Sequence, residues 1–174
     1  MTTTGHDFVS LLPNVCTNPK APCGTVQHAV SRANPGDEIH VAEGLYTDLH
    51  SLSGLTQVVY VDRSIVVRGG YTSDFKTRNP KLHPTTLNAK GGGRVVYITG
   101  DVTAGLEGLR ITGGDAAGMG GAPTGDAGGG IYVVSATVTV EGCQVYDNAA
   151  TSGGGVCLFS AIPVLALSSR GIAL

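Results

Sequence analysis

The residues of this 174-residue chain that could do chemistry are few and scattered. Asp115 and Asp126 lie in and beside a glycine-rich insertion, residues 116–127, and Asp147 lies at an expected turn. These carboxylates could converge on one edge and bind a hard cation such as Ca²⁺, which takes several oxygen ligands. Asp also favours turns for backbone reasons alone. We therefore assign no metal ligand from the sequence.

The histidines and glycine-rich stretches match no catalytic pattern either. His28 and His40 are expected on outward, solvated faces, and no Gly-x-Ser-x-Gly elbow is present. No Gly-Lys-Ser/Thr follows the glycines at 91–93, 118–121 and 128–130, so we interpret these as turns rather than phosphate loops. The five dispersed histidines are His6, His28, His40, His50 and His83. We predict no catalytic, metal or cofactor-binding residue, and no cofactor.

The four cysteines form no CxxC pair, and no nearby histidine completes a zinc set. Cys16 and Cys23 flank a loop rich in Pro, Asn and Lys. From the sequence, these two residues could form a disulfide or remain free thiols. Cys143 falls where an earlier repeat has Leu109, so it is expected to be a small buried apolar residue. The fourth cysteine is Cys157.

Composition narrows the class of protein. The chain is 41% hydrophobic and 14% charged, with 27 glycines and a net charge of −2, which suits β-structure with tight turns. The absence of a basic stripe argues against nucleic acid. The apolar stretch from Val156 to Leu167 contains Pro163 and is too short to span a membrane. The first seven residues show no signal peptide.

An internal repeat is the strongest structural signal. The stretch Leu106–Ile111 is echoed by Val140–Val145. The stretch Gly128–Ala136 is echoed by Gly153–Ala161, 25 positions later. A strand-like unit recurring at such a period is typical of a solenoid. Glu107 and Glu141 match in the two copies and are expected to form a solvated ladder.

The segment 24–36 is expected to be a short amphipathic helix. Thr25 can cap it, Val26, Ala29, Val30 and Ala33 share one face, and Gln27 and His28 lie on the other. This helix would cover the open end of the first coil. Short strands follow, at 37–44, 45–47, 58–61, 64–68, 86–89, 95–98, 109–111, 131–134, 137–140 and 143–145.

Two all-β architectures fit these strands, an antiparallel sandwich and a parallel β-helix. The chain contains neither Asn-Gly nor Asp-Gly, the usual two-residue hairpin turns of a sandwich. Aligning the repeats places Ile65, Leu109 and Cys143 in one column, and Val67, Ile111 and Val145 in the next. The expected fold class is all-β: a right-handed parallel β-helix (solenoid) with a short N-terminal capping α-helix, truncated at the C-terminus.

The expected organisation is a single domain, a fragment of a longer protein. It comprises an irregular N-terminal segment (1–23), a capping helix (24–36) and parallel β-helix coils (37–174). The repeat pattern decays after Ala161, which suggests a truncated or frameshifted product of a longer gene.

Residues 16–161 resemble the N-terminal portion of secreted bacterial right-handed parallel β-helix proteins of the pectate-lyase-like superfold. The similarity is carried by Cys23–Val30, Pro35–Val41, Gly44–Tyr46, Arg68–Tyr71 and Pro84–Ala89. That resemblance implies about three strands per coil and, in some members, polysaccharide lyase or glycoside hydrolase activity. The polygalacturonase-like and pectate-lyase signature phrases are absent from this chain.

The expected function is therefore a secreted or cell-surface β-helix scaffold without catalytic activity. It would display loops, chiefly 71–93 and 114–129, to polysaccharide or a cell-surface glycan. One alternative is a truncated polysaccharide lyase or glycoside hydrolase, and another is a structural element that self-associates through its C-terminal end. Aromatic content of 5% without Trp is thin for a sugar-binding surface.

Overall fold

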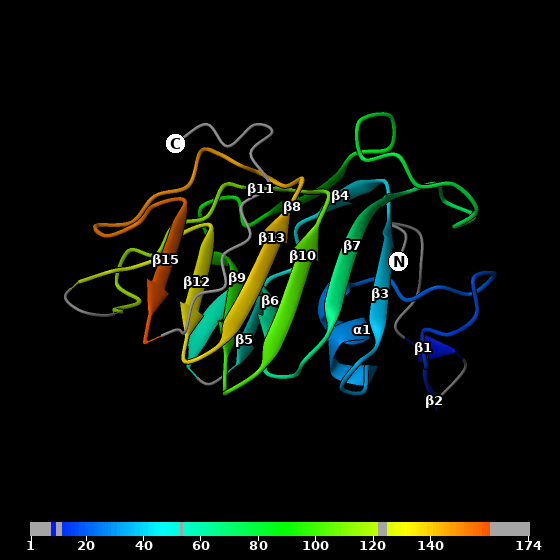
Figure 1. Cartoon of the computed structure of the whole chain (residues 1–174), viewed down its shortest axis with the longest axis horizontal. Helices are drawn as coiled ribbons and strands as arrows, with labels where there is room; N and C mark the ends of the chain where they lie inside the picture. The colour runs from blue at the N-terminus through cyan, green and yellow to red at the C-terminus, as the bar shows by residue number, and fades with distance from the viewer. Residues whose placement is uncertain (1–7, 10–11, 53, 122–124, 161–174) are drawn as a thin grey trace.

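The computed structural model describes residues 8–9, 12–52, 54–121 and 125–160, which fold into short strands and one helix (Figure 1). The helix, α1, spans Val26–Arg32. The strands are β1 (Phe8–Val9), β2 (Leu12–Pro13), β3 (Glu38–Ala42), β4 (Gly44–Tyr46), β5 (His50–Leu52), β6 (Leu55–Val61), β7 (Val66–Tyr71), β8 (Thr85–Asn88), β9 (Arg94–Thr99), β10 (Thr103–Glu107), β11 (Leu109–Thr112), β12 (Ile131–Val134), β13 (Thr137–Glu141), β14 (Gln144–Val145) and β15 (Val156–Phe159).

Three sheets hold all of these strands except the β1–β2 pair. Their spatial orders are β13-β10-β7-β3, β14-β11-β8-β4 and β15-β12-β9-β6-β5. Neighbouring strands in the three sheets run parallel, apart from the antiparallel pair β5–β6 at one edge. Strands that follow one another in sequence therefore usually belong to different sheets.

The internal repeat of the sequence is confirmed as strand register. Glu107 pairs with Glu141 between β10 and β13, and Ile131 pairs with Val156 between β12 and β15. Each repeated Leu-Glu-Gly or Val-Glu-Gly phrase turns between two sheets, because Gly108 and Gly142 adopt φ of 62° and 59°. That left-handed conformation costs glycine little.

Each of the two predicted columns is partly right. Leu109 lies against Cys143, since its backbone N–H donates to the Cys143 Sγ at 3.4 Å. Ile111 does pair with Val145, but its other neighbour is Leu87, while Val67 pairs with Leu106 in a different sheet. Leu109 pairs with Thr85 rather than sharing a row with Ile65. The error arose because β10 was not predicted. The residues of β11, which follow the bend at Gly108, were therefore aligned with β7, although β7 pairs with β10.

The expected fold class is corrected by this arrangement. The right-handed parallel β-helix was predicted as one tube of stacked coils, with the chain forming a solenoid. The described residues instead form three separate sheets of mainly parallel strands with one short helix, and the sheets do not close. Each sheet ends in two edge strands, and the β1–β2 and β5–β6 pairs are antiparallel. The predicted truncation concerns residues after Ala161, which lie outside the described residues.

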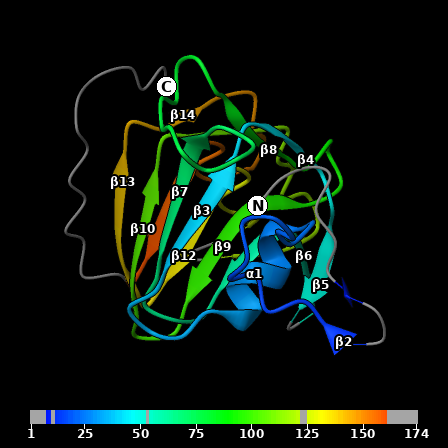
Figure 2. The ribbon, with the colours of Figure 1, turned by 90° about the vertical axis from the view of Figure 1, so that its right-hand side faces the viewer.

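The core lies between the sheets and is aliphatic, and α1 packs against it beside β3 and β6 (Figure 2). Val26, Ala29 and Val30 are buried, which confirms the predicted apolar face of the helix. This helix has only seven residues. No helix in the described ranges has the length and apolar character needed to cross a membrane.

Gln27 was predicted on the solvated face of the helix, and that was wrong. It is buried, its Oε1 accepts a 2.6 Å hydrogen bond from the Tyr60 backbone N–H, and its Nε2 donates to the Tyr60 carbonyl at 3.3 Å. β5 pairs with β6 only as far as Gln57, so the backbone farther along β6 needs another partner. A buried unpaired peptide group is costly, and Gln27 supplies the missing bonds.

β7 was expected to end at Gly69 and Gly70, but it continues to Tyr71. A Cβ on Gly69 would lie 2.7 Å from Leu109 Cδ2 and 2.9 Å from the Gly108 carbonyl oxygen. Glycine is therefore required here by the close approach of Gly108 and Leu109, where β10 bends into β11, and not by a turn at Gly69 itself.

Candidate functional site

A cleft of about 570 Å³ lies beside the N-terminal loop. Its lining combines the loop, the end of α1, the start of β3 and a hairpin tip. The side chains that matter below are Cys16, Cys23, Arg32, Asp37, His40 and Phe75.

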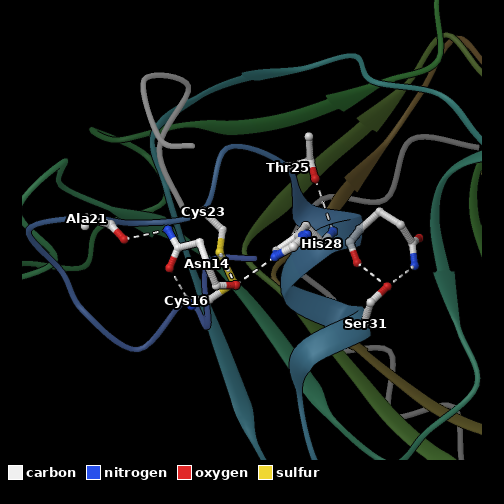
Figure 3. The surroundings of a disulfide bond; sticks show 8 residues. Asn14, Cys16, Ala21, Cys23, Thr25, His28 and Ser31 are labelled. Atoms are coloured by element: carbon white, nitrogen blue, oxygen red, sulfur yellow. Dashed lines mark hydrogen bonds between the residues drawn. A yellow bond between two sulfur atoms is a disulfide. The ribbon is translucent and has the colours of Figure 1, made fainter. Parts of the chain in front are cut away.

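The loop wall is closed by a disulfide between Cys16 and Cys23. Asn14, which is buried, braces it from inside: its Oδ1 accepts a bond from the Cys16 backbone N–H at 2.9 Å, and its Nδ2 donates to the Ala21 carbonyl at 2.8 Å (Figure 3). The sequence left two alternatives for these cysteines, a disulfide or two free thiols, and the structure contains the disulfide. Cys23 is fully buried and Cys16 is partly exposed.

His28 lies against this disulfide, which the sequence did not reveal. Thr25 caps α1 by accepting a 3.1 Å bond from the His28 backbone N–H, and this places His28 in the first helical turn. Its Nε2 lies 2.7 Å from the Asn14 carbonyl oxygen (Figure 3). The predicted outward orientation of His28 was wrong. The cap residue and the spacing to Cys23 were the available signals, but only the fold of the loop brings them together.

The opposite wall carries the rings of His40 and Phe75, and the Tyr71 ring lies beside both. His40 stacks on Tyr71 with ring centroids 4.3 Å apart, and the Phe75 ring lies 6.5 Å from that of Tyr71. His40 is exposed, as the sequence predicted. His40, Tyr71 and Phe75 are hereafter called the aromatic cluster. They come from β3, the end of β7 and the following loop, so they are close only because β3 pairs with β7.

The loop after β7 holds Phe75 firmly. The Thr72 backbone N–H donates to the Thr77 carbonyl at 2.9 Å, and the Asp74 carboxylate accepts bonds from the Thr72 hydroxyl and the Lys76 backbone N–H. These bonds lower the pKa of Asp74 to about 2. Phe75 has φ of 60°, which is uncommon for a bulky residue and which the surrounding bonds enforce.

Charges of both signs surround the cleft. The Glu38 carboxylate lies 3.4 Å from His40 Nε2 and makes an ion pair with Arg68 at 3.1 Å. Asp37 accepts a 2.7 Å bond from the Asn34 backbone N–H, and Arg32 is exposed at the rim. The cleft is therefore neither strongly acidic nor strongly basic, and it offers both donors and acceptors.

The predicted ladder of Glu107 and Glu141 lies outside this cleft. The two residues are neighbours in register, but Glu107 is engaged with Arg68 at 3.1 Å and Arg78 at 3.5 Å, while Glu141 is exposed. Arg68 Nε is not directed at the Glu107 oxygen, so we count this contact as an ion pair without a hydrogen bond. Only Glu141 fits the prediction of a simply solvated side chain.

Two of the three aspartates considered as a cation site accept backbone hydrogen bonds instead. Asp115 accepts a bond from the Ala117 N–H, and Asp126 accepts bonds from the Gly118 and Gly120 N–H groups at 3.0 and 2.8 Å. These last two bonds lower the pKa of Asp126. Asp147 lies at a turn with φ of 51°. Within the described ranges, one group of His, Cys, Asp or Glu could hold a metal ion, and it is Cys16, Cys23 and His28.

The remaining candidates lie apart. His83 pairs with Glu43 at 2.9 Å, His50 is at the start of β5, and His6 lies outside the described residues. Cys143 is buried as predicted, and burial raises the pKa of its thiol to about 11. A second groove of about 390 Å³ runs past Lys81, Arg110 and Gln144.

Comparisons with known proteins found no matching family model, no matching curated protein and no matching solved structure. The resemblance to pectate-lyase-like proteins described above therefore stays a prediction.

Proposed function

We propose that this chain is a non-catalytic binding scaffold, secreted or on the cell surface, that takes carbohydrate of a surface glycan into the cleft beside its disulfide. The aromatic cluster, of which His40 and Phe75 line the cleft, is the observation that carries the proposal. Sequence composition made sugar binding look poorly supported, because aromatic residues are scarce. The fold gathers three rings from separate segments at one place.

The chemistry of the cleft suits a sugar ring. Sugars present an apolar C–H face that packs against an aromatic ring, and a rim of hydroxyls that both donate and accept hydrogen bonds. Phe75 and His40 supply the ring surface, while Arg32 and Asp37 supply a donor and an acceptor at the rim. A volume of about 570 Å³ lies inside the range of roughly 300–1,000 Å³ typical of ligand sites.

The disulfide supports the proposed location. Disulfides form and persist in oxidising compartments, which include the cell exterior. The proposal keeps the role of residues 71–93 and 114–129 as displayed loops. The first of these loops contributes Phe75 to the cleft.

A glycan array followed by isothermal titration calorimetry tests the proposal. The wild-type chain should bind at least one glycan, and Phe75→Ala should weaken that binding by about tenfold or more, because a buried aromatic side chain contributes roughly 1.5–3 kcal/mol. Phe75→Tyr keeps the ring and should retain binding.

Tyr146→Ala is the matched control, because Tyr146 is an exposed aromatic residue that does not line the cleft. Circular dichroism should show that all three variants fold. The proposal fails if no glycan on the array binds, or if Phe75→Ala and Tyr146→Ala bind as well as the wild type.

Self-association is a second candidate, favoured by the sheet edges. β13, β14 and β15 each pair with a neighbour on one side only among the described residues. Such edges can pair with another chain. Light scattering should then show mass rising with concentration, and Phe159→Lys on β15 should reduce it; a constant monomer mass would exclude this function.

A further inference from the structure

We propose that Cys16, Cys23 and His28 form a site for a thiophilic divalent cation, with Zn²⁺ as the best fit, once their disulfide is reduced. The inference is independent of the glycan proposal. It begins from the ligand atoms: the two Sγ atoms and one ring nitrogen of His28 all lie within 4.8 Å of one another. They come from two separate segments, the N-terminal loop and α1 (Figure 3).

An oxygen completes the set. The Asn14 carbonyl oxygen lies 2.7 Å from His28 Nε2 and 3.7 Å from the Sγ atoms of both Cys16 and Cys23. The Asn14 side chain is bonded to the loop at both of its polar atoms, so this carbonyl has a fixed place. Two sulfurs, a nitrogen and an oxygen therefore lie close together, with the oxygen within 3.7 Å of the other three atoms.

The two sulfurs and the imidazole nitrogen match zinc, which binds Cys thiolate and His nitrogen. Zn²⁺ prefers four tetrahedral ligands, with Zn–S near 2.3 Å and Zn–N near 2.0 Å. Thiolate and imidazole together select zinc over the hard cations Ca²⁺ and Mg²⁺. Two Zn–S bonds at the tetrahedral angle hold their sulfurs about 3.8 Å apart, so the sulfurs must separate after reduction.

The loop can allow that separation at one cysteine. Cys23 is 1% exposed and packs in the core, so it should stay in place. Cys16 is partly exposed and lies in an irregular loop, where its side chain can rotate. It also has φ of 65°, a conformation that strains a residue with a side chain and that a freed loop could relax.

The chemistry balances with an external reductant. A water-soluble phosphine reduces the disulfide and is itself oxidised to the phosphine oxide. One water molecule supplies the oxygen of the oxide and the two protons of the resulting thiols. Binding of Zn²⁺ then replaces the two thiol protons, which are released to solvent. Oxidation by a disulfide reagent would reverse the first step and expel the ion.

The test uses the full chain, reduced with a phosphine and desalted without oxygen. Zn²⁺ is titrated against a chromophoric chelator, and Co²⁺ is titrated as a spectroscopic probe of thiolate ligation. The reduced chain should bind one Zn²⁺ and should give the visible bands of tetrahedral Co²⁺ with thiolate ligands. The oxidised chain should bind neither.

Two variants define the site. His28→Ala should weaken Zn²⁺ binding by more than about tenfold, since even partners outside the ligand shell contribute that much. The double variant Cys143→Ser, Cys157→Ser removes the two cysteines outside the disulfide and should bind as the wild type does. Zn²⁺ should also raise the Tm of the reduced wild type but not of reduced His28→Ala.

The proposal is overturned if the reduced chain binds no zinc, or if oxidised and reduced chains bind equally. It is equally overturned if the Cys143/Cys157 variant loses the binding, or if His28→Ala leaves affinity and Co²⁺ spectrum unchanged. None of these results depends on whether the chain binds glycans.

Discussion

Replacing Arg94 is the substitution for which the structure makes the sharpest stability prediction. Arg94 begins β9 and is fully buried. Its Nε donates to the Ala127 carbonyl at 2.8 Å, and its Nη2 donates to the Gly120 carbonyl at 2.5 Å. The guanidinium also lies 4.6 Å from the centre of the Tyr132 ring. This one side chain thus fastens the C-terminal end of the glycine-rich insertion, and a point within it, to the sheet.

The size of the effect follows from these contacts. Two hydrogen bonds from a charged donor contribute about 1.5–3 kcal/mol each, and the ring contact adds about 1–2 kcal/mol. Two effects reduce this stabilisation. Burial disfavours the charge and lowers the pKa of the guanidinium. In addition, Nη1 has no hydrogen-bond partner in the described part of the chain. We expect Arg94→Met to lower the free energy of unfolding by about 3–4 kcal/mol.

Urea unfolding followed by circular dichroism measures this change, and limited proteolysis reports on the insertion. Arg94→Met should speed cleavage near Met119 relative to the wild type. Arg94→Lys keeps the charge but cannot reach two carbonyls at once, so it should lose about half as much. Arg110→Met, at a half-buried arginine in the second groove, should change stability by less than about 0.5 kcal/mol. Equal stability of Arg94→Met and Arg110→Met would refute this reasoning.

Three further outcomes are expected. Reducing the disulfide should lower the free energy of unfolding by about 2.5 kcal/mol, as measured in urea without added metal, because it closes a short loop. Gln27→Leu should cost about 1–3 kcal/mol by leaving the backbone of Tyr60 unpaired, and amide exchange at Tyr60 should accelerate. Asp74 has a pKa lowered from 3.8 to about 2, so its support of the loop is complete above pH 4 and is lost as the pH falls through 2. An NMR pH titration should show this for the wild type and not for Asp74→Asn; a normal Asp74 pKa would contradict it.

The strands were largely predictable from the sequence, while the assembly of sheets was not. Alternating or continuous runs of Val, Ile and Leu mark β9, β12 and β13, because such runs need a face to bury. β10 was missed because Thr103, Ala104 and Gly105 give it little strand character. The solenoid interpretation came from the repeat, which the register supports, but a repeat does not determine whether sheets close.

The site depended on contacts that no pattern in the sequence contains. The aromatic cluster needs β3 and β7 to pair in one register, since His40 and Tyr71 are far apart in the chain. His28 was interpreted as solvated because helical spacing puts it opposite the apolar face. The N-terminal loop folds back over that side of the helix, so tertiary structure overrides the spacing.

The central claim is that the cleft between the disulfide loop and the aromatic cluster is where a glycan binds. The most direct measurement is NMR chemical-shift mapping of the isotope-labelled chain titrated with the best glycan from the array. The shifts should concentrate on Cys16, Arg32, His40 and Phe75. Shifts that gather instead around Lys81, Arg110 and Gln144, or that spread without a centre, would contradict the account.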